Sequence, residues 1–165
     1  MTRQLHPFPP VWDSDCRVLL LGSFPSVRSR ENGFFYGHPR NRFWPLLAAL
    51  LDCPVPQTVP EKRELLLQHH LALWDVLAAC DIEASSDSSI RNAVPNDLLP
   101  ILHGAPVRHI FCNGTTAYRL YVRYQQPLTK LEAVCLPSTS PANARWQMDR
   151  LLAAWRCILS EPAAD

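Results

Sequence analysis

Short runs of consecutive apolar residues recur along the chain, and most of them are followed by a glycine, a proline or a polar residue. Runs of this length are too short for helices and are typical of strands that are buried on both faces of a parallel sheet. The pattern predicts four such strands, over residues 17–21, 73–77, 107–112 and 131–136.

The segments between these strands carry capping signals or helical periodicity. Asn41 suits the start of a helix that runs to residue 50, with Pro45 in its first turn. Further helices are predicted over residues 60–71, 96–103, 115–124 and 143–159. Two segments without such a period are rich in serine, one of them also in glycine and proline, and are predicted to be loops: residues 22–39 and 84–92.

Alternation of strands and helices predicts parallel βαβ units. The expected fold is α/β, a three-layer α/β/α sandwich with a short, mainly parallel four-stranded central sheet. We expect one domain over residues 1–165, with residues 1–15 as an N-terminal extension. Ligands of such sheets bind beyond the carboxyl ends of the strands. Polar residues gather at those ends, at residues 22–26, 75, 113–114 and 137–141.

Composition narrows the classes of function. The formal net charge is +1, yet residues 28–42 contain four arginines and only one acidic residue, which indicates a local basic patch. The six cysteines show neither CxxC pairs nor zinc-finger spacing, so we expect them to be reduced and mostly buried, with no metal and no iron–sulfur cluster. Glycine-rich cofactor signatures are absent, and we expect no cofactor. Without a leader or an apolar membrane segment, a soluble cytoplasmic protein is expected.

Two segments carry a recognisable pattern. The first joins Gly-Ser-Phe-Pro-Ser at 22–26 to His-Pro-Arg-Asn-Arg-Phe-Trp at 38–44, and the second is Leu-Pro-Ser-Thr-Ser-Pro-Ala-Asn at 136–143. Together they resemble the active-site motifs of the uracil-DNA glycosylase superfamily, and most closely its hypoxanthine (deoxyinosine) branch. The sequence departs from the uracil-specific members at Phe24, where they place a water-activating Asp or Asn, and at Leu136, where His or Asn is common.

The resemblance implies roles for individual residues. Asn41 is expected to be catalytic, either orienting water or hydrogen-bonding the base, although its residue type also suits a helix cap. His38 is expected to donate to the leaving base or to contact phosphate. Four residues are expected to bind the base: Phe24, Tyr36, Ser23 and Asn113. Asp75, an acid at a strand end, is expected to have a structural role rather than a catalytic one.

Residues that contact DNA are expected on the loops around these motifs. Hydroxyl groups, helix-start amides and arginines position the phosphate backbone in such enzymes. The expected DNA-binding residues are Ser26, Arg40, Arg42, Ser138, Thr139, Ser140, Pro141 and Asn143. The alternative interpretation of the second motif is a capping loop for the last helix.

The resemblance therefore implies a monofunctional DNA glycosylase that flips out a deaminated base and hydrolyses its N-glycosidic bond. Hypoxanthine is the expected substrate, with uracil or xanthine as alternatives, in double-stranded or else single-stranded DNA. No lysine stands in either motif, which argues against a Schiff-base lyase step. We expect a monomer. Two other classes stay open: a damage-binding module without catalysis, and a thiol hydrolase.

Overall fold

The computed structural model describes residues 2–159, and its centre is a parallel sheet of four strands in the order β3-β2-β6-β7. The strands are β2 (Val18–Gly22), β3 (Leu71–Asp75), β6 (His109–Asn113) and β7 (Ala133–Leu136). Every residue of β2 and β3 is buried, as expected of strands covered on both faces. Each of the four predicted strands is confirmed, although the bounds of β3 lie two residues earlier than predicted.

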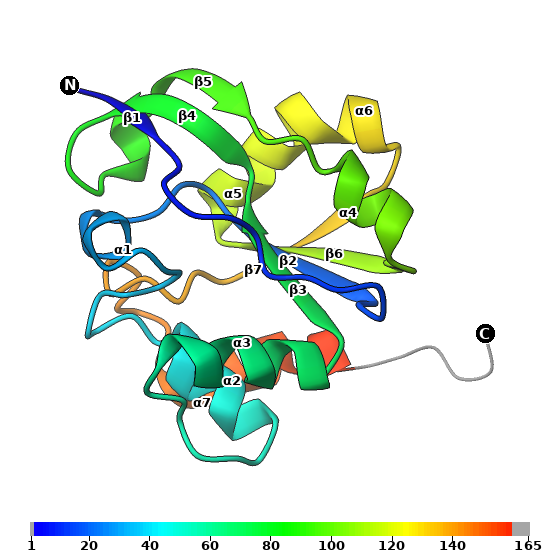
Figure 1. Cartoon of the computed structure of the whole chain (residues 1–165). Coiled ribbons are helices and arrows are strands. Elements are labelled where there is room, and N and C mark those ends of the chain that lie inside the picture. The colour runs from blue at the N-terminus through cyan, green and yellow to red at the C-terminus, as the bar shows by residue number, and fades with distance from the viewer. Residues whose placement is uncertain (1, 160–165) are drawn as a thin grey trace.

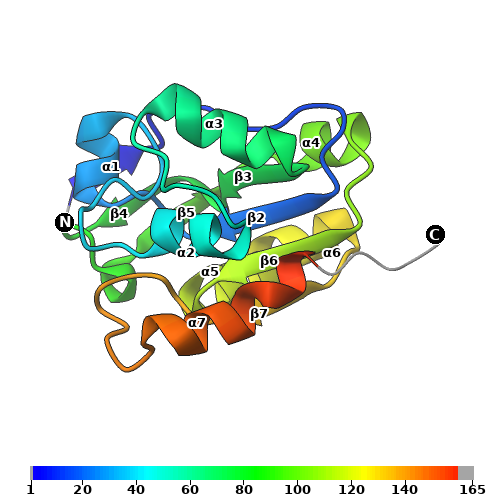
Figure 2. The same ribbon diagram turned by 90° about the horizontal axis from the view of Figure 1, so that it is seen from below.

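Helices cover both faces of this sheet. Figure 1 shows one layer on the lower face, formed by α2 (Phe43–Leu50), α3 (Val59–Gln68) and α7 (Met148–Trp155). The opposite face carries α4 (Leu99–Gly104), α5 (Thr115–Leu120) and α6 (Gln126–Thr129). Seen from below, in Figure 2, α2, α3 and α7 lie in front of the parallel strands. The predicted three-layer α/β/α sandwich is confirmed.

Local sequence explains how the lower layer forms. A capping box starts α3, because the Thr58 hydroxyl accepts from the Glu61 amide while the Glu61 carboxylate accepts from the Thr58 amide. The α2 helix buries Phe43, Trp44 and Leu47 and packs against α7. Among residues 2–159, no helix has the length and apolar character needed to cross a bilayer.

A second, antiparallel sheet was not predicted. It consists of β1 (Thr2–Leu5), β4 (Leu77–Ile82) and β5 (Arg91–Pro95), in the order β1-β4-β5. Only Val76 separates β3 from β4, so the predicted strand 73–77 spans the junction of the two sheets. Mostly exposed residues in β1 and β5, and register shifts between β4 and β5, leave little alternating pattern for sequence reading to find.

Residues 2–15 are packed into the fold rather than appended to it. The β1 strand pairs with β4, from Thr2 opposite Ile82 to Leu5 opposite Ala79. Phe8 is buried, and Val11 is fully buried where it pairs with Leu73 of β3. The segment thus links the two sheets, and the description of it as an N-terminal extension is corrected.

Four further differences concern helices and cysteines. The predicted loop 22–39 contains a helix, α1 (Val27–Asn32), and the last helix begins at Met148 because residues 137–147 form a loop. The helix that starts at Thr115 passes into a π-helical turn, Tyr121–Gln125. Cys16, Cys80 and Cys112 are buried, but Cys53 is half-buried and Cys135 and Cys157 are exposed, so the expectation of mostly buried cysteines is wrong.

Candidate functional site

A cleft of about 370 Å³ opens at the carboxyl ends of the parallel strands, where the fold class places ligands. Both sequence motifs contribute to its walls. It is lined by Gly22, Ser23, Phe24, Pro25, Ser26, Ser29, Phe35, Tyr36, His38, Asn41, Asp75, Ser85, Asp87, Asn113, Ser138, Thr139, Ser140, Pro141 and Ala142. We call the deep part formed by Gly22, Tyr36, Asp75, Asn113 and Thr139 the floor, and the outer part formed by His38, Ser85, Asp87, Ser138 and residues 140–142 the rim.

Asn41 lies at the start of α2 with its amide orientation fixed. Its Oδ1 accepts from the backbone amide of Phe43 at 2.9 Å and from the Thr139 hydroxyl at 2.9 Å. Because a backbone N–H can only donate, the atom that faces it is the oxygen. Both lone pairs of the carbonyl are therefore used, and the Nδ2 group is left to donate into the cleft. One side chain therefore both caps the start of α2 and presents a hydrogen-bond donor to the cleft.

Thr139 is fully buried and connects the ends of three segments. Its hydroxyl accepts from Asn113 Nδ2 at 3.0 Å while it donates to Asn41, and its backbone amide donates to Asn113 Oδ1 at 3.0 Å. Its carbonyl accepts from the Arg42 amide at 3.1 Å. The amide of Asn113 is consequently oriented as firmly as that of Asn41, with one Nδ2 hydrogen remaining for the cleft.

Tyr36 belongs to the floor of the cleft and has a strained backbone conformation. Its φ of 53° lies in the left-handed region, which non-glycine residues seldom occupy outside functional or otherwise constrained positions. One face of its ring stacks on Phe43 with centroids 4.2 Å apart. Its hydroxyl is buried next to the Asn113 amide, although not in ideal hydrogen-bond geometry. Burial, and then the nearby Asp75 carboxylate, raise the pKa of Tyr36 well above its ordinary value, against the opposing effect of the Asn113 amide, so the hydroxyl keeps its proton.

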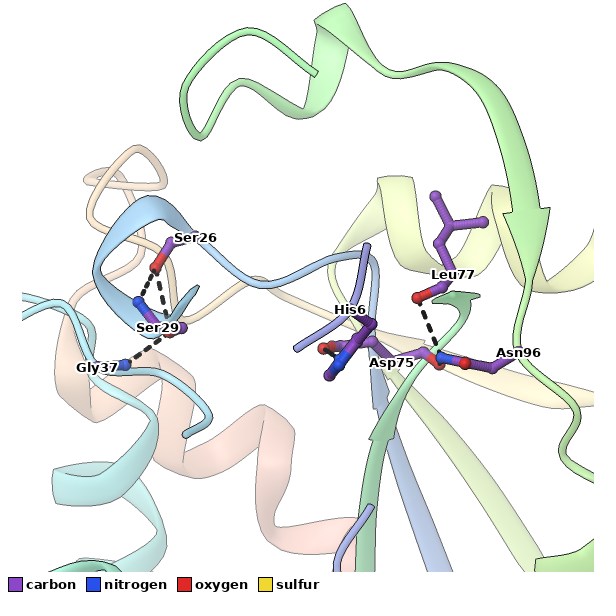
Figure 3. Close-up of polar contacts among 7 residues, drawn as sticks. All are labelled: His6, Ser26, Ser29, Gly37, Asp75, Leu77 and Asn96. Carbon is purple, nitrogen blue, oxygen red and sulfur yellow. Dashed lines mark hydrogen bonds and ion pairs between the residues drawn. The ribbon is translucent and has the colours of Figure 1, made fainter. Parts of the chain in front are cut away.

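The Asp75 carboxylate lies at the bottom of the floor and pairs with His6. His6 Nε2 is 2.7 Å from Asp75 Oδ2, and the two side chains are only 3% and 4% exposed. Figure 3 shows the two groups pointing toward one another at the end of β3. Aromatic rings enclose the imidazole, with the Trp74 and Phe8 centroids 4.5 and 4.6 Å away. Asp75, expected to be structural, therefore both pairs with His6 and lines the cleft.

A buried amide ladder holds the backbone behind Asp75. Asn96 Nδ2 donates to the carbonyls of Asp75 and Leu77 at 2.8 and 3.0 Å, as Figure 3 shows for Leu77. Gln125, from the π-helical turn, donates to the carbonyls of Asn96 and Val76 at 2.7 and 3.2 Å. The junction of the two sheets is thus fixed by side chains that are themselves buried, which gives the floor a rigid support.

The rim contains a histidine and a second carboxylate. His38 Nδ1 lies 3.1 Å from the Arg40 amide and accepts from it, which places the proton of a neutral imidazole on Nε2. Ser23 donates to Asp87 Oδ1 at 3.0 Å. Asp87 as a residue is exposed, but partial desolvation of its carboxyl group raises the pKa of Asp87. The hydrogen bond from Ser23 opposes this rise, and the negative charge of Asp75 adds to it.

Several predicted DNA-binding residues are engaged within the protein. Ser26 caps α1, since its hydroxyl accepts from the Ser29 amide. As Figure 3 shows, the Ser29 hydroxyl in turn accepts a hydrogen bond from the Gly37 backbone amide at 2.9 Å. The Ser138 and Ser140 hydroxyls accept from backbone amides of their own loop. They still line the cleft, so a contact with DNA remains a prediction for each.

Arg42, Asn143 and Arg40 do not line the cleft. The Arg42 guanidinium turns inward and donates to the carbonyls of Trp146, Ser140 and Asn143. Asn143 donates to the Ser138 carbonyl at 2.9 Å. Both side chains are therefore better explained as supports of the loop 137–147 than as phosphate ligands, whereas Arg40 is exposed beside the rim.

The thiol-hydrolase alternative finds no support, because the cleft-lining residues include no cysteine. Burial raises the pKa of Cys112 to about 12 and that of Cys16 to about 11, which suppresses the thiolate. Within the described part of the chain, no cluster of three or more histidine, cysteine or acidic side chains is arranged to hold a metal ion.

The sequence did not indicate four contributors to the site: His6, Ser29, Ser85 and Asp87. The serine-rich segment 84–92 gave a partial signal, since polar loops in compact domains tend to be functional. Nothing local marks His6, whose partner Asp75 lies 69 positions away.

Comparison with known proteins agrees with the fold and the motifs. A chain of Methanosarcina acetivorans named hypoxanthine DNA glycosylase is 35% identical over 147 residues, which cover 87% of this chain and 90% of the relative. A protein of the same name from Methanosarcina barkeri is 32% identical over 142 residues, covering 84% and 87%.

A solution NMR structure of a candidate uracil DNA glycosylase from Methanosarcina acetivorans superposes with a TM-score of 0.76 at 31% identity, covering 92% of this chain and 96% of that one. The sequence model of the uracil DNA glycosylase superfamily matches residues 9–158, which include both motifs and every residue that lines the cleft. The chain belongs to the uracil DNA glycosylase superfamily.

Proposed function

We propose that the protein is a DNA glycosylase that releases hypoxanthine from deoxyinosine in double-stranded DNA and leaves an abasic site. The observation that carries the proposal is the pair of asparagine amides, Asn41 and Asn113, which a buried threonine fixes with donors facing one cleft. The two relatives named hypoxanthine DNA glycosylase support the choice of base.

The cleft suits a single flipped nucleotide. Its volume, about 370 Å³, lies at the lower end of the range for small-molecule sites, which fits one base with its sugar. Tyr36 and Phe24 supply apolar ring surfaces there. A base extruded from the duplex needs such surfaces to replace the stacking that it loses, at a cost of about a few kcal/mol.

Asn41 acts as a donor in this proposal. With its carbonyl saturated by Phe43 and Thr139, the side chain cannot accept a proton or a hydrogen bond from water. Donation to the water oxygen would draw on the lone pair needed for attack. Donation to a ring nitrogen or carbonyl of the departing base instead stabilises the negative charge that develops as the glycosidic bond breaks. Of the two roles expected for Asn41, the base contact is therefore favoured.

The rim is the part that would meet the DNA backbone. His38 offers Nε2–H, and the loop 138–142 presents backbone amides and hydroxyls beside the cleft. Exposed Arg40 adds positive charge at the same edge. Together these groups match the mixture of charged and neutral donors that positions phosphates without reading sequence.

The test is excision from labelled duplexes that carry one deoxyinosine, deoxyuridine or deoxyxanthosine, with EDTA present and alkali used to reveal abasic sites. We expect release from deoxyinosine by the wild type and its loss in Asn41→Ala. The matched control is Gln57→Ala, an exposed amide remote from the cleft, which should keep wild-type activity.

Two outcomes would overturn parts of the proposal. Release of uracil in preference to hypoxanthine would change the base but keep the reaction. Tight binding of inosine-containing DNA without release of any base, by protein shown to be folded, would establish a damage-binding module instead. Borohydride-trapped adducts would reveal a lyase step, which a site without a lysine in its motifs does not provide.

A further inference from the structure

The buried pair of His6 and Asp75 has no role in the chemistry assigned to Asn41. Polar groups are costly to bury even when they are hydrogen-bonded, so a buried pair of this kind that borders a ligand cleft calls for an explanation beyond stability. Asp75 Oδ2 is occupied by His6 Nε2 at 2.7 Å, while the residue also lines the cleft.

The second oxygen of Asp75 faces the cleft above Gly22. A Cβ atom placed on Gly22 would lie 2.5 Å from Asp75 Oδ1 and 2.9 Å from Tyr36 Oη, so glycine alone leaves room for these two oxygens. Tyr36 Oη is buried beside the Asn113 amide, which directs a hydrogen toward it, so the Tyr36 O–H hydrogen is the donor left for a ligand. An acceptor and a donor therefore converge on one end of the cleft.

This arrangement is complementary to a lactam. Hypoxanthine presents a ring N–H next to a carbonyl, whereas adenine presents a bare ring nitrogen next to an amino group. A carboxylate accepts hydrogen bonds and donates none. Asp75 Oδ1 would thus accept from the N–H of a lactam and repel the lone pair of adenine, while the Tyr36 hydroxyl donates to the carbonyl.

We propose that Asp75 is the specificity-determining residue that reads the lactam N–H of the flipped base, and that His6 is a positioning residue that fixes which carboxylate oxygen faces it. The inference rests on the proposed function and refines it, because it names the chemical edge by which the substrate is selected. His6 reaches this place through the N-terminal segment that follows β1 (Thr2–Leu5).

The surroundings of His6 support a positioning role. The imidazole is held among aromatic rings, with Phe24 and Phe35 centroids 6.0 and 6.1 Å away in addition to Phe8 and Trp74. Its Nδ1 is buried without a hydrogen-bond partner within the described residues, so its polar contact is directed at Asp75. A ring held in this way leaves the carboxylate little freedom to rotate.

The test measures recognition separately from catalysis. The probes are duplexes with 2′-fluoro-deoxyinosine or 2′-fluoro-deoxynebularine opposite cytosine, since 2′-fluorination suppresses glycosidic cleavage. Nebularine has no N–H and no carbonyl at the edge in question. We expect the wild type to bind the inosine probe about 10- to 100-fold more tightly, the range for a hydrogen bond to a charged group.

Substitutions of Asp75 should remove this preference. In Asp75→Asn, His6 holds the new carbonyl and the amide hydrogens face the base, so the inosine-to-nebularine ratio should fall to about one or below. The matched control is Asp81→Asn on β4, whose carboxylate binds Asn92 and Arg3 outside the cleft and should keep the wild-type ratio.

Substitutions of His6 test positioning. His6→Gln retains a donor for Asp75 and should keep most of the ratio, whereas His6→Leu should lose it while still binding DNA. A folded Asp75→Asn protein with the wild-type ratio would overturn the assignment of Asp75, and the same result for His6→Leu would overturn that of His6. Failure of the wild type to release hypoxanthine would refute the proposed function alone, because the binding ratio is measured without cleavage.

Discussion

The floor and the rim of the cleft are built in different ways. On the floor, Asp75, Asn113 and the neighbouring Asn41 each have their polar atoms oriented by buried partners. On the rim, His38 and Asp87 are held by a single contact each and border solvent. Rigid donors and acceptors suit the reading of one base edge, whereas adaptable ones suit a phosphate backbone whose path varies. The comparison predicts that floor substitutions alter chemistry and base choice, and rim substitutions alter DNA affinity.

The largest effect is expected from Asn41. Asn41→Asp keeps an oxygen for the Phe43 amide and the Thr139 hydroxyl but removes the donor, so the single-turnover excision rate should fall about 100- to 1000-fold, as for loss of a preorganised donor. Asn41→Ala should fall as far and also melt at a lower temperature. An aspartate variant with wild-type excision would show that Asn41 serves only as a cap.

Gly22→Ala tests the rigidity of the floor directly. The added methyl group would sit 2.5 Å from Asp75 Oδ1, so the carboxylate or the strand end must shift. Displacement by an ångström in a reacting site costs about 100-fold in rate. We expect that loss in excision, with DNA affinity within about twofold of wild type. Equal losses in rate and affinity would mean that the distinction between floor and rim is wrong.

Thr139→Val breaks the link between Asn41 and Asn113. Removing the hydroxyl leaves a buried amide hydrogen and a carbonyl lone pair unsatisfied, which should lower the free energy of unfolding by about 1–3 kcal/mol. Excision should fall about tenfold as the two amides lose their orientation. Thr139→Ser retains the hydroxyl and is the control; chemical denaturation and single-turnover kinetics measure both effects.

Two neighbouring arginines sharpen the comparison at the rim. Arg40→Gln should weaken DNA binding and lower the slope of log affinity against log salt by about one. Arg42→Gln should leave that slope unchanged and lower the melting temperature, because its guanidinium holds the carbonyls of the loop 137–147. An unchanged melting temperature with a reduced slope for Arg42 would restore its predicted phosphate contact.

The smallest effect concerns Asp87. Desolvation of the carboxyl group raises the pKa of Asp87 in the folded protein, so the folded state binds this proton more tightly than the unfolded state does. The stability that this group contributes is therefore present at low pH and is lost as pH rises through the folded pKa. Asp87→Asn should show a gain in stability relative to wild type that grows with pH, by less than about 1 kcal/mol because the residue is exposed. A gain that shrinks with pH would reverse the assignment.

Sequence reasoning reached those parts of the molecule whose signals are local. The apolar runs predict the parallel strands, and the two motifs predict that Asn41 and Tyr36 belong to the site. Thr139, which was predicted to contact DNA, is instead fully buried and bonds to Asn41 and Asn113. Contacts between distant positions leave no such signal, so the pairing of His6 with Asp75 and the antiparallel sheet were not predicted. Arg42 shows another limit, because charge alone suggests solvent or phosphate, whereas three carbonyls of a neighbouring loop draw it inward.

The pairing of β1 with β4 has a consequence for synthesis of the protein. Thr2 lies opposite Ile82, so β1 has no strand partner until about 80 further residues have been translated. At ordinary elongation rates this delay is roughly ten seconds. During that interval β1 has no strand partner on the nascent chain, and the His6 imidazole has not yet paired with the Asp75 carboxylate. The His6–Asp75 pair therefore depends on the synthesis of β2 and β3 but not on β6 and β7, which are translated later.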